Sequence, residues 1–348
     1  PRRYLAISLL SALIAAGLWY WMRPAPATKA PSTSSSYSVA LAQAHNGQPG
    51  AARVLYQQLA RTDLSDIRRA SLHAELPNYP SPQALKLADA DLLHPSPLVR
   101  QAAIQSIAGL VPNAQRTLLL GPLLDDPEQS VRFTAASALL GLSPDEQGLY
   151  FAPLQQVIDE YERDLKTRPD DPQAQGQLAR LYLHEGQLDE AQAALEKVTA
   201  LDPENLKAVV AQVELLDKRG QTDRARELLA RQLEEHPESA YLQHALGIWL
   251  LNHGQTEYAL LGLAKAVELE PDNSDYRYKL AIALHDLDQL EAAQRQLEEL
   301  LQRQPANRKA RVLLIRYWKE SGQIQNVQVL LAQMEQLNPD DPALQQGL

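Results

Sequence analysis

Hydrophobic and polar positions follow a helical period along most of the chain. Residues 150–166 (YFAPLQQVIDEYERDLK) place apolar side chains three and four positions apart, as on one face of an amphipathic helix. No alternating pattern of the strand type extends over a useful length. The pattern therefore predicts an all-α protein.

The amino terminus differs, because residues 4–22 contain no charged side chain. A helix of this length spans about 28 Å, close to the hydrocarbon thickness of a bilayer. Arg2 and Arg3 precede the run, whereas Arg23 and Lys29 follow it. We interpret residues 1–22 as a transmembrane signal anchor with a cytoplasmic amino terminus. The alternative is a secretory signal cleaved after the small-x-small sequence Ala-Pro-Ala at residues 25–27, which would release a soluble periplasmic protein.

A segment rich in proline, serine and alanine follows at residues 23–37. It has no helical period and too few apolar residues to form a core, so we predict a linker. Either interpretation of the amino terminus places the residues beyond this linker in the periplasm. In the anchor interpretation a single span also tethers them to the inner membrane.

The second half of the chain has a period of 34 residues. Glycines of a short turn between helices recur at this interval, with aspartate once in their place: Gly186, Gly220, Gly254, Asp288 and Gly322. Prolines that end the second helix recur likewise: Pro169, Pro203, Pro237, Pro271, Pro305 and Pro339. This pattern resembles the tetratricopeptide repeat. We predict a tetratricopeptide domain over residues 150–348, with five full repeats at about residues 172–339.

A second period, of 32 residues, lies upstream. Val99-Arg100 and Val131-Arg132 each open a helix of small and apolar residues, and Ile67-Arg68 precedes them at the same spacing. These units resemble HEAT repeats. We therefore expect a helical hairpin and HEAT-like repeats over residues 38–149, continuous with the tetratricopeptide superhelix in one solenoid of helical hairpins.

Composition excludes several kinds of chemistry. The chain has no cysteine, which excludes disulfides, thiolate metal sites and thioether-bound haem. Its net charge of −10 argues against a nucleic-acid partner. No nucleotide-binding, hydrolase or metalloprotease motif occurs, and the eight histidines are scattered. We expect no catalytic, metal or cofactor site and no small-molecule substrate.

The remaining candidate chemistry is recognition of a protein partner. In tetratricopeptide repeats the first helix of each repeat lines the concave face, and its inward positions are apolar or aromatic in the central repeats. An extended segment or a helix with apolar anchors would fit such a groove. The same residues could instead pack between neighbouring helices. The candidates are Val210, Tyr241, His244, Ile248, Leu251, Tyr278 and Ile282.

The first helix of the last repeat is basic in a chain that is acidic overall. Lys309, Arg316 and Lys319 could contact an acidic tail or a terminal carboxylate. A solvated positive face is the alternative interpretation.

A narrower resemblance involves the segment HALGIWLLNHGQTEYALLGLAKAVELEPDNSDYRYKLAIAL. It is similar to the tetratricopeptide region that follows HEAT-like repeats in bacterial multihaem cytochromes c, over about residues 92–341. No Cys-x-x-Cys-His haem motif is present in this sequence. The resemblance implies association with a respiratory or envelope complex. The expected function is a membrane-anchored, non-catalytic periplasmic scaffold that helps to assemble or stabilise such a complex. The alternatives are a chaperone-like adaptor for exported or cytochrome precursors, and a regulatory subunit of a membrane enzyme such as a polysaccharide synthase.

Overall fold

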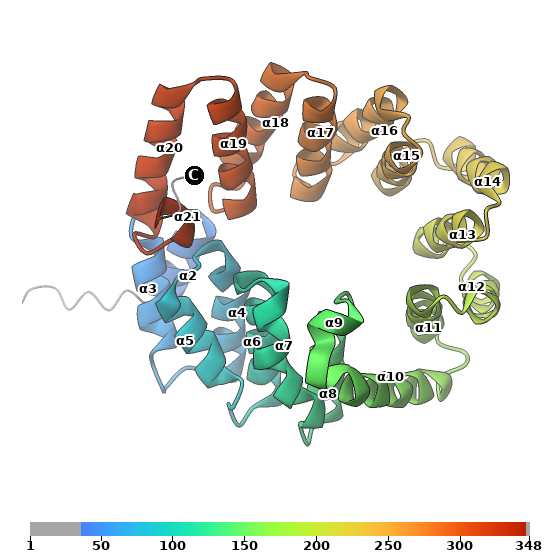
Figure 1. Ribbon diagram of the computed structural model, residues 1–348, viewed down its shortest axis with the longest axis horizontal. Coiled ribbons are helices and arrows are strands. Elements are labelled where there is room, and N and C mark those ends of the chain that lie inside the picture. The colour runs from blue at the N-terminus through green and yellow to red at the C-terminus, as the bar shows by residue number, and fades with distance from the viewer. Residues whose placement is uncertain (1–35, 346–348) are drawn as a thin grey trace, which may run out of the picture. The chain divides into compact units, whose positions relative to one another are not determined.

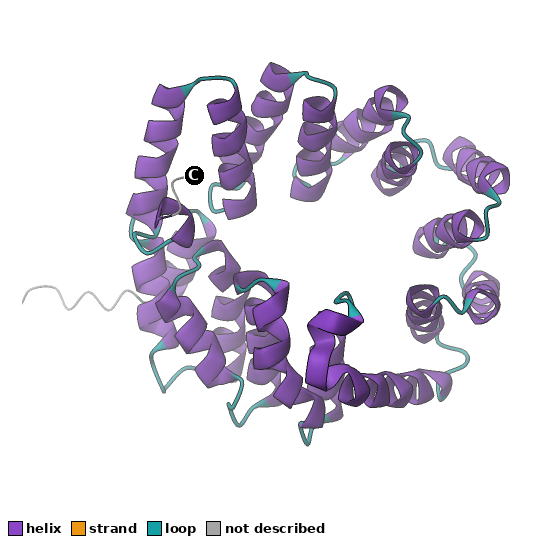
Figure 2. Ribbon diagram, in the orientation of Figure 1, coloured by secondary structure: helices purple, strands orange, loops and turns teal. Residues whose placement is uncertain are grey.

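The computed structural model describes residues 36–345, and these residues form helices without any strand (Figures 1 and 2). From Tyr37 onward the described residues belong to one compact unit. The transmembrane anchor and most of the linker expected at residues 1–37 lie outside the described residues. Within residues 36–345, no helix combines the length and apolar character needed to cross a bilayer.

The amino-terminal part of the unit consists of short helices packed as hairpins. They are α2 (Tyr37–His45), α3 (Ala51–Leu59), α4 (Asp66–Glu75), η1 (Leu76–Asn78), α5 (Pro82–Asp91), α6 (Pro97–Leu110), α7 (Asn113–Leu120), η2 (Gly121–Asp125), α8 (Gln129–Leu139), α9 (Pro144–Gln147), η3 (Gly148–Tyr150) and α10 (Phe151–Lys166).

The carboxy-terminal part consists of five longer hairpins and a final turn of helix. They are α11 (Pro172–Glu185), α12 (Leu188–Leu201), α13 (Leu206–Lys218), α14 (Thr222–Glu235), α15 (Ala240–Asn252), α16 (Thr256–Leu269), α17 (Ser274–Asp286), α18 (Leu290–Arg303), α19 (Arg308–Glu320), α20 (Ile324–Leu337) and α21 (Pro342–Gln345).

Arginines on α4, α6 and α8 each bond an acidic residue of a later segment. Arg100 forms two hydrogen bonds with Asp126, at 2.9 and 2.8 Å, and also donates to the carbonyls of His94 and Pro95. Arg132 repeats this arrangement with Glu160 and the carbonyls that precede α8. In the first unit the equivalent residue is Arg69, which bonds Asp91 at 2.7 Å. The residue expected from the 32-residue period, Arg68, lies instead over the ring of Tyr37.

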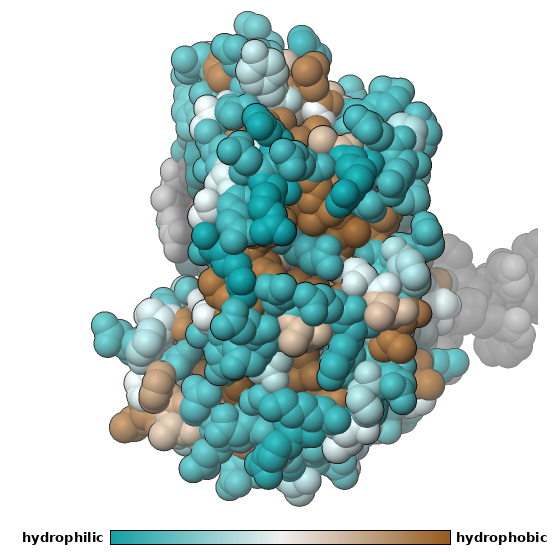
Figure 3. Space-filling model, turned by 90° about the vertical axis from the view of Figure 1, so that its right-hand side faces the viewer, coloured by the Kyte–Doolittle hydropathy of each residue, from teal (hydrophilic) through white to brown (hydrophobic). Residues whose placement is uncertain are grey.

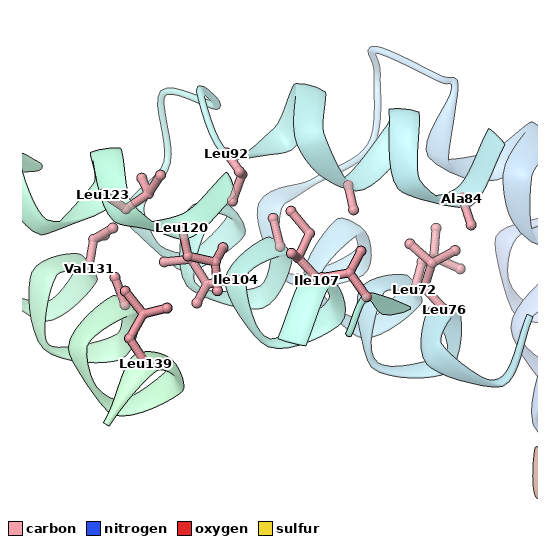
Figure 4. Packing of buried hydrophobic residues seen from close by; sticks show 14 of the residues in the cluster. Leu72, Leu76, Ala84, Leu92, Ile104, Ile107, Leu120, Leu123, Val131 and Leu139 are labelled. Atoms are coloured by element: carbon pink, nitrogen blue, oxygen red, sulfur yellow. The ribbon is translucent and has the colours of Figure 1, made fainter. Parts of the chain in front are cut away.

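Between these arginine contacts the hairpins share one apolar core. Figure 4 shows its leucine, isoleucine and valine side chains pointing toward one another from successive helices. Ile104 and Ile107 on α6 and Leu139 on α8 are fully buried. This core gives the amino-terminal hairpins a continuous interior.

The 34-residue period corresponds to a recurrent turn. The first helix of each repeat ends at a residue with left-handed backbone, with φ of 73° at Gly186 and 71° at Gly220. Asp288 takes the same conformation with φ of 58°, so the departure from glycine leaves the turn intact. The following amide then donates to a carbonyl five residues back, as from Gln187 to Tyr182 and from Gln289 to Leu284. These bonds are those of a Schellman motif, which ends the helix.

The start of each repeat is fixed by a side-chain cap. Asp171, Asn205, Ser239, Asn273 and Asn307, again 34 residues apart, each accept a hydrogen bond from a backbone amide in the first turn of the next helix. Asp341 continues this series by accepting from the amide of Ala343. The polar residue after each proline is thus a helix cap.

Two helical glycines allow the close packing of α15 on α16. A Cβ atom on Gly262 would lie 2.7 Å from the carbonyl oxygen of Gln243, and one on Gly247 would lie 2.6 Å from Leu263 Cγ. Neither position has space for a side chain. The central repeat is therefore held by direct contact of the two helix backbones.

The first and last hairpins of the unit contact each other, so the array of helices closes on itself (Figure 1). The amide of Gly50 donates to the carbonyl of Gln336 at 2.7 Å, and Asn338 Nδ2 donates to the carbonyl of Pro80 at 2.7 Å. Ala306 and Leu337 belong to the amino-terminal core. The last tetratricopeptide hairpin, α19–α20, is thus covered by the first hairpin of the unit, α2–α3, and the segment before α5.

Candidate partner-binding face

The first helices of the five repeats, α11, α13, α15, α17 and α19, lie on the inner side of the array, and the second helices lie outside them (Figure 1). We call the inner side of these five helices the inner face. One register of this face runs Arg180, Glu214, Ile248, Ile282 and Arg316, at intervals of 34 residues. The inner face is therefore apolar in its third and fourth repeats and charged at both ends.

A pocket of about 660 Å³ opens on this face between α13 and α15. We call it the α13–α15 pocket. Four of the seven groove residues predicted from the sequence line it: Val210, Tyr241, His244 and Ile248. The rest of its wall is formed by Val213, Glu214, Asp217, Lys218, Leu229, Ala245, Trp249, Asn252 and His253. The 34-residue register also placed Glu214 and Asp217 on this face, but it did not indicate Trp249 as a wall residue.

The other three predicted groove residues lie outside the pocket. Leu251, Tyr278 and Ile282 are half-buried and pack against the core of the third to fifth repeats. Ile248 touches the same core and also lines the pocket. For these positions the structure shows packing between helices together with partial exposure.

The pocket lies where the apolar core is interrupted between the second and third repeats. A small separate cluster there contains Val213, Leu229 and Trp249, with larger clusters before and after it. A second pocket of about 540 Å³ lies between α12 and α14 and is lined largely by polar side chains. Figure 3 shows the outer side formed by these helices as mainly hydrophilic, with apolar patches between polar ridges. The second repeat is therefore loosely packed on both sides.

Aromatic rings stack along the pocket and beside it. The rings of Trp249 and His253 are 4.1 Å apart, and those of His244 and Tyr276 are 4.6 Å apart. Burial lowers the pKa of His244, and the nearby Lys279 lowers it further. Burial also raises the pKa of Tyr241, so both side chains are neutral near pH 7.

Three polar atoms of this region are buried without a hydrogen-bond partner: Trp249 Nε1, His244 Nε2 and Asp217 Oδ1. Buried polar atoms in folded proteins are normally paired, so each of these indicates a place for a missing partner. All three residues line the α13–α15 pocket.

The basic residues of α19 are divided between two roles. Lys309, Arg316 and Lys319 are exposed, as an acidic ligand would require. Two further arginines of this helix are structural: Arg308 binds Asp341 through two hydrogen bonds of 2.7 Å, and Arg311 is buried and donates to the carbonyl of Pro305. Contact with an acidic ligand therefore stays a prediction for the three exposed residues.

One group with catalytic residue types appears only in the folded chain. His73 lies 2.7 Å from Asp91 and 3.0 Å from the Ser106 hydroxyl. The hydroxyl donates to the carbonyl of His73, and Ser106 is 1% exposed. Burial alone would raise the pKa of Asp91, but hydrogen bonds from His73 and Arg69 lower it. His73, Asp91 and Ser106 form a buried network that joins α4, α5 and α6. The serine has no access to a substrate, so we do not interpret this group as a catalytic site.

Across the part of the chain that the structure describes, His, Cys, Asp and Glu side chains form no cluster of three that could hold a metal ion.

Comparison with known proteins identifies the repeat type. Two descriptions of the tetratricopeptide repeat match this chain, one over residues 154–203 and 183–247 and the other over residues 263–295. A search of curated proteins gives no match. The prediction of tetratricopeptide repeats is thus confirmed.

Several solved structures are similar to parts of this chain. Yeast Tom70 is 14% identical and has a TM-score of 0.50, with 85% of this chain and 61% of that chain covered. A thermophilic tetratricopeptide protein of Thermus thermophilus, TTC0263, is 22% identical over 59% of this chain and 98% of that chain, with a TM-score of 0.41. YrrB, described as a tetratricopeptide protein with an unusual peptide-binding site, is 18% identical over 55% of this chain and 98% of that chain, with a TM-score of 0.37. At 14% identity the likeness to Tom70 concerns the fold alone. The chain is an all-helical solenoid that carries tetratricopeptide repeats between residues 154 and 295.

Proposed function

We propose that this chain is a non-catalytic scaffold or adaptor that binds a partner protein through the inner face of its tetratricopeptide repeats. Tetratricopeptide repeats generally mediate contacts between proteins. The observation that carries the proposal is the α13–α15 pocket, which combines apolar walls with buried polar atoms that lack partners. Interfaces concentrate their binding energy at such places, where an anchoring side chain is desolvated.

The ligand of this face is a protein segment with apolar anchors. Ile248, Ile282 and Tyr278 are half-buried and offer apolar surface over two successive repeats. Charged residues flank this surface on both sides, with Arg180 in the first repeat and Arg316 in the last. Such an order of residues suits an apolar segment with polar ends.

The proposal also includes a place in the cell. The uncharged run at residues 4–22 and the two arginines before it support an inner-membrane anchor, with the solenoid in the periplasm. A tether of this kind raises the local concentration of the binding face near membrane partners. The recurrent arginine contacts of Arg69, Arg100 and Arg132 support a HEAT-like assignment for the amino-terminal hairpins. Together these features favour a role in assembling or stabilising an envelope complex.

Replacing Tyr241 and Tyr278 together with alanine tests the binding face. We expect the partner recovered with the tagged full chain to fall about tenfold or more, because buried aromatic anchors contribute strongly to interfaces. Quantitative mass spectrometry of co-purified proteins measures the recovery, and circular dichroism measures helicity, which should stay unchanged.

Tyr258→Ala is the matched control, since this tyrosine is 65% exposed on the outer helix α16. Its partner recovery should equal that of the unmodified chain. Equal recovery in the double variant would contradict the proposed binding face, and a loss of helicity would show that the two tyrosines mainly support the core.

A further inference from the structure

We propose that the α13–α15 pocket binds a long cationic side chain, arginine or lysine, presented by the partner segment. This inference rests on the proposed function and specifies the chemistry of its ligand. It is carried by a buried carboxylate oxygen without a hydrogen-bond partner, by a lysine that bonds elsewhere, and by the apolar and aromatic wall around them.

The carboxylate is that of Asp217 on α13. Its Oδ1 is buried and has no hydrogen-bond partner, although His253 Nε2 lies 3.5 Å away. His253 Nδ1 lies 2.7 Å from the carbonyl of Trp249, so this nitrogen carries the proton and donates to that carbonyl. Nε2 can therefore donate to Asp217 only when the ring carries a second proton, and then only over 3.5 Å. Among the described residues, Asp217 Oδ1 thus has no hydrogen-bond donor within bonding distance.

The lysine of the pocket does not supply this donor. Lys218 Nζ donates to the carbonyl of Leu183 at 2.9 Å and lies 3.6 Å from Glu214 Oε1. These contacts place its charge against Glu214 and the end of α11, so Lys218 makes no hydrogen bond to Asp217. The lining residues thus include two carboxylates and one ammonium group that is already engaged. A cationic ligand would balance the remaining negative charge.

Other nearby cations lie outside the pocket. The charge of Arg180 on α11 partly offsets the rise that burial causes in the pKa of Tyr241. The charge of Lys279 on α17 adds to the fall that burial causes in the pKa of His244. Neither cation lines the pocket. They instead favour acidic residues on either side of the cationic anchor.

The walls suit the rest of an arginine or lysine side chain. Val210, Val213 and Ile248 offer aliphatic surface to a methylene stem. Tyr241 and Trp249 offer aromatic rings near which a guanidinium or ammonium group is favourable. An apolar anchor would use the same walls but leave Asp217 without a donor, and an acidic anchor would add a like charge.

The test uses two small probes of similar length on the full chain, with ¹⁵N-labelled tryptophan. The probes are n-butylguanidinium and uncharged 1-pentanol. The indole N–H resonance of Trp249, assigned with Trp249→Phe, is followed by NMR during titration. We expect n-butylguanidinium to shift this resonance saturably, with at least about tenfold higher affinity than 1-pentanol.

Asp217→Asn should weaken binding of n-butylguanidinium by about tenfold, because it removes the charge that pairs with the ligand. Asp223→Asn is the matched control, since Asp223 is an exposed carboxylate on the outer helix α14, and its variant should bind as the unmodified chain does. Equal affinity of the two probes, or no saturable shift by n-butylguanidinium, would overturn the inference even if Asp217→Asn failed to fold.

This result is distinguishable from failure of the proposed function. If partner recovery depends on Tyr241 and Tyr278 but n-butylguanidinium does not bind, the inner face remains a binding face and only the cationic anchor is wrong. If the probe binds through Asp217 while partner recovery ignores both tyrosines, the pocket is cation-binding but the proposed partner contact is wrong.

Discussion

Arg100→Met is expected to lower the free energy of unfolding of the amino-terminal hairpins by about 3–5 kcal/mol, the cost of leaving one member of a buried ion pair alone. The side chain of Asp126 is 6% exposed, so its charge would stay in the core without its partner. The carbonyls of His94 and Pro95 would lose their donor as well. Urea denaturation of the full chain, followed by hydrogen exchange of residues 37–150, measures the loss and locates it.

Arg226→Met is the control for this experiment. Its side chain is 64% exposed and pairs with Asp223 on the same helix, so the change should stay within about 1 kcal/mol. Arg100→Met combined with Asp126→Leu should recover part of the loss, since it removes both charges. A loss below about 1 kcal/mol for Arg100→Met alone would mean that water replaces the arginine and that the pair does not hold the hairpins together.

Gly47→Ala is expected to separate the first hairpin from the last. Gly47 has a left-handed backbone with φ of 56°, and a Cβ atom there would lie 2.7 Å from the carbonyl carbon of Pro305. Backbone atoms cannot move aside as a flexible side chain can. The variant should therefore lose the contacts of Gly50 with Gln336 and of Asn338 with Pro80.

Because the chain has no cysteine, two dyes can be attached specifically at Gln57→Cys on α3 and Glu335→Cys on α20, both exposed. Energy transfer between them should fall in Gly47→Ala. Gly186→Ala is the matched control, since it introduces the same left-handed strain of about 1–2 kcal/mol but its Cβ atom would meet nothing within 4 Å. Unchanged transfer in Gly47→Ala, or an equal fall in both variants, would show that the close approach of Gly47 to Pro305 does not decide closure.

Much of the fold could be predicted because its determinants are local. The left-handed turn at Gly186 and the cap at Asn205 depend on residues within one helical turn, and they recur with the repeat. Asp288 follows the same rule, because aspartate tolerates left-handed geometry.

Features that depend on contacts between distant residues could not be predicted in this way. Asn338 binds the carbonyl of Pro80 across 258 positions of sequence, and no period indicates such a contact. Arg69, rather than Arg68, reaches Asp91 because side-chain direction on α4 decides which arginine faces α5.

The candidate site was predictable only in part, for the same reason. Periodicity places Tyr241 and Ile248 on the inner helices, but the pocket beside them results from an interrupted core between the second and third repeats. The missing donor for Asp217 depends on where Lys218 and His253 bind, which only the folded chain shows.

The central claim is that the inner face binds a partner protein, and site-specific photo-crosslinking in intact cells tests it most directly. A photoreactive p-benzoylphenylalanine replaces Ile248 in the α13–α15 pocket or, separately, Leu261, which is 71% exposed on the outer helix α16. We predict a discrete crosslinked partner from position 248 and none from position 261. A partner crosslinked from position 261 alone, or from neither position, would contradict the account.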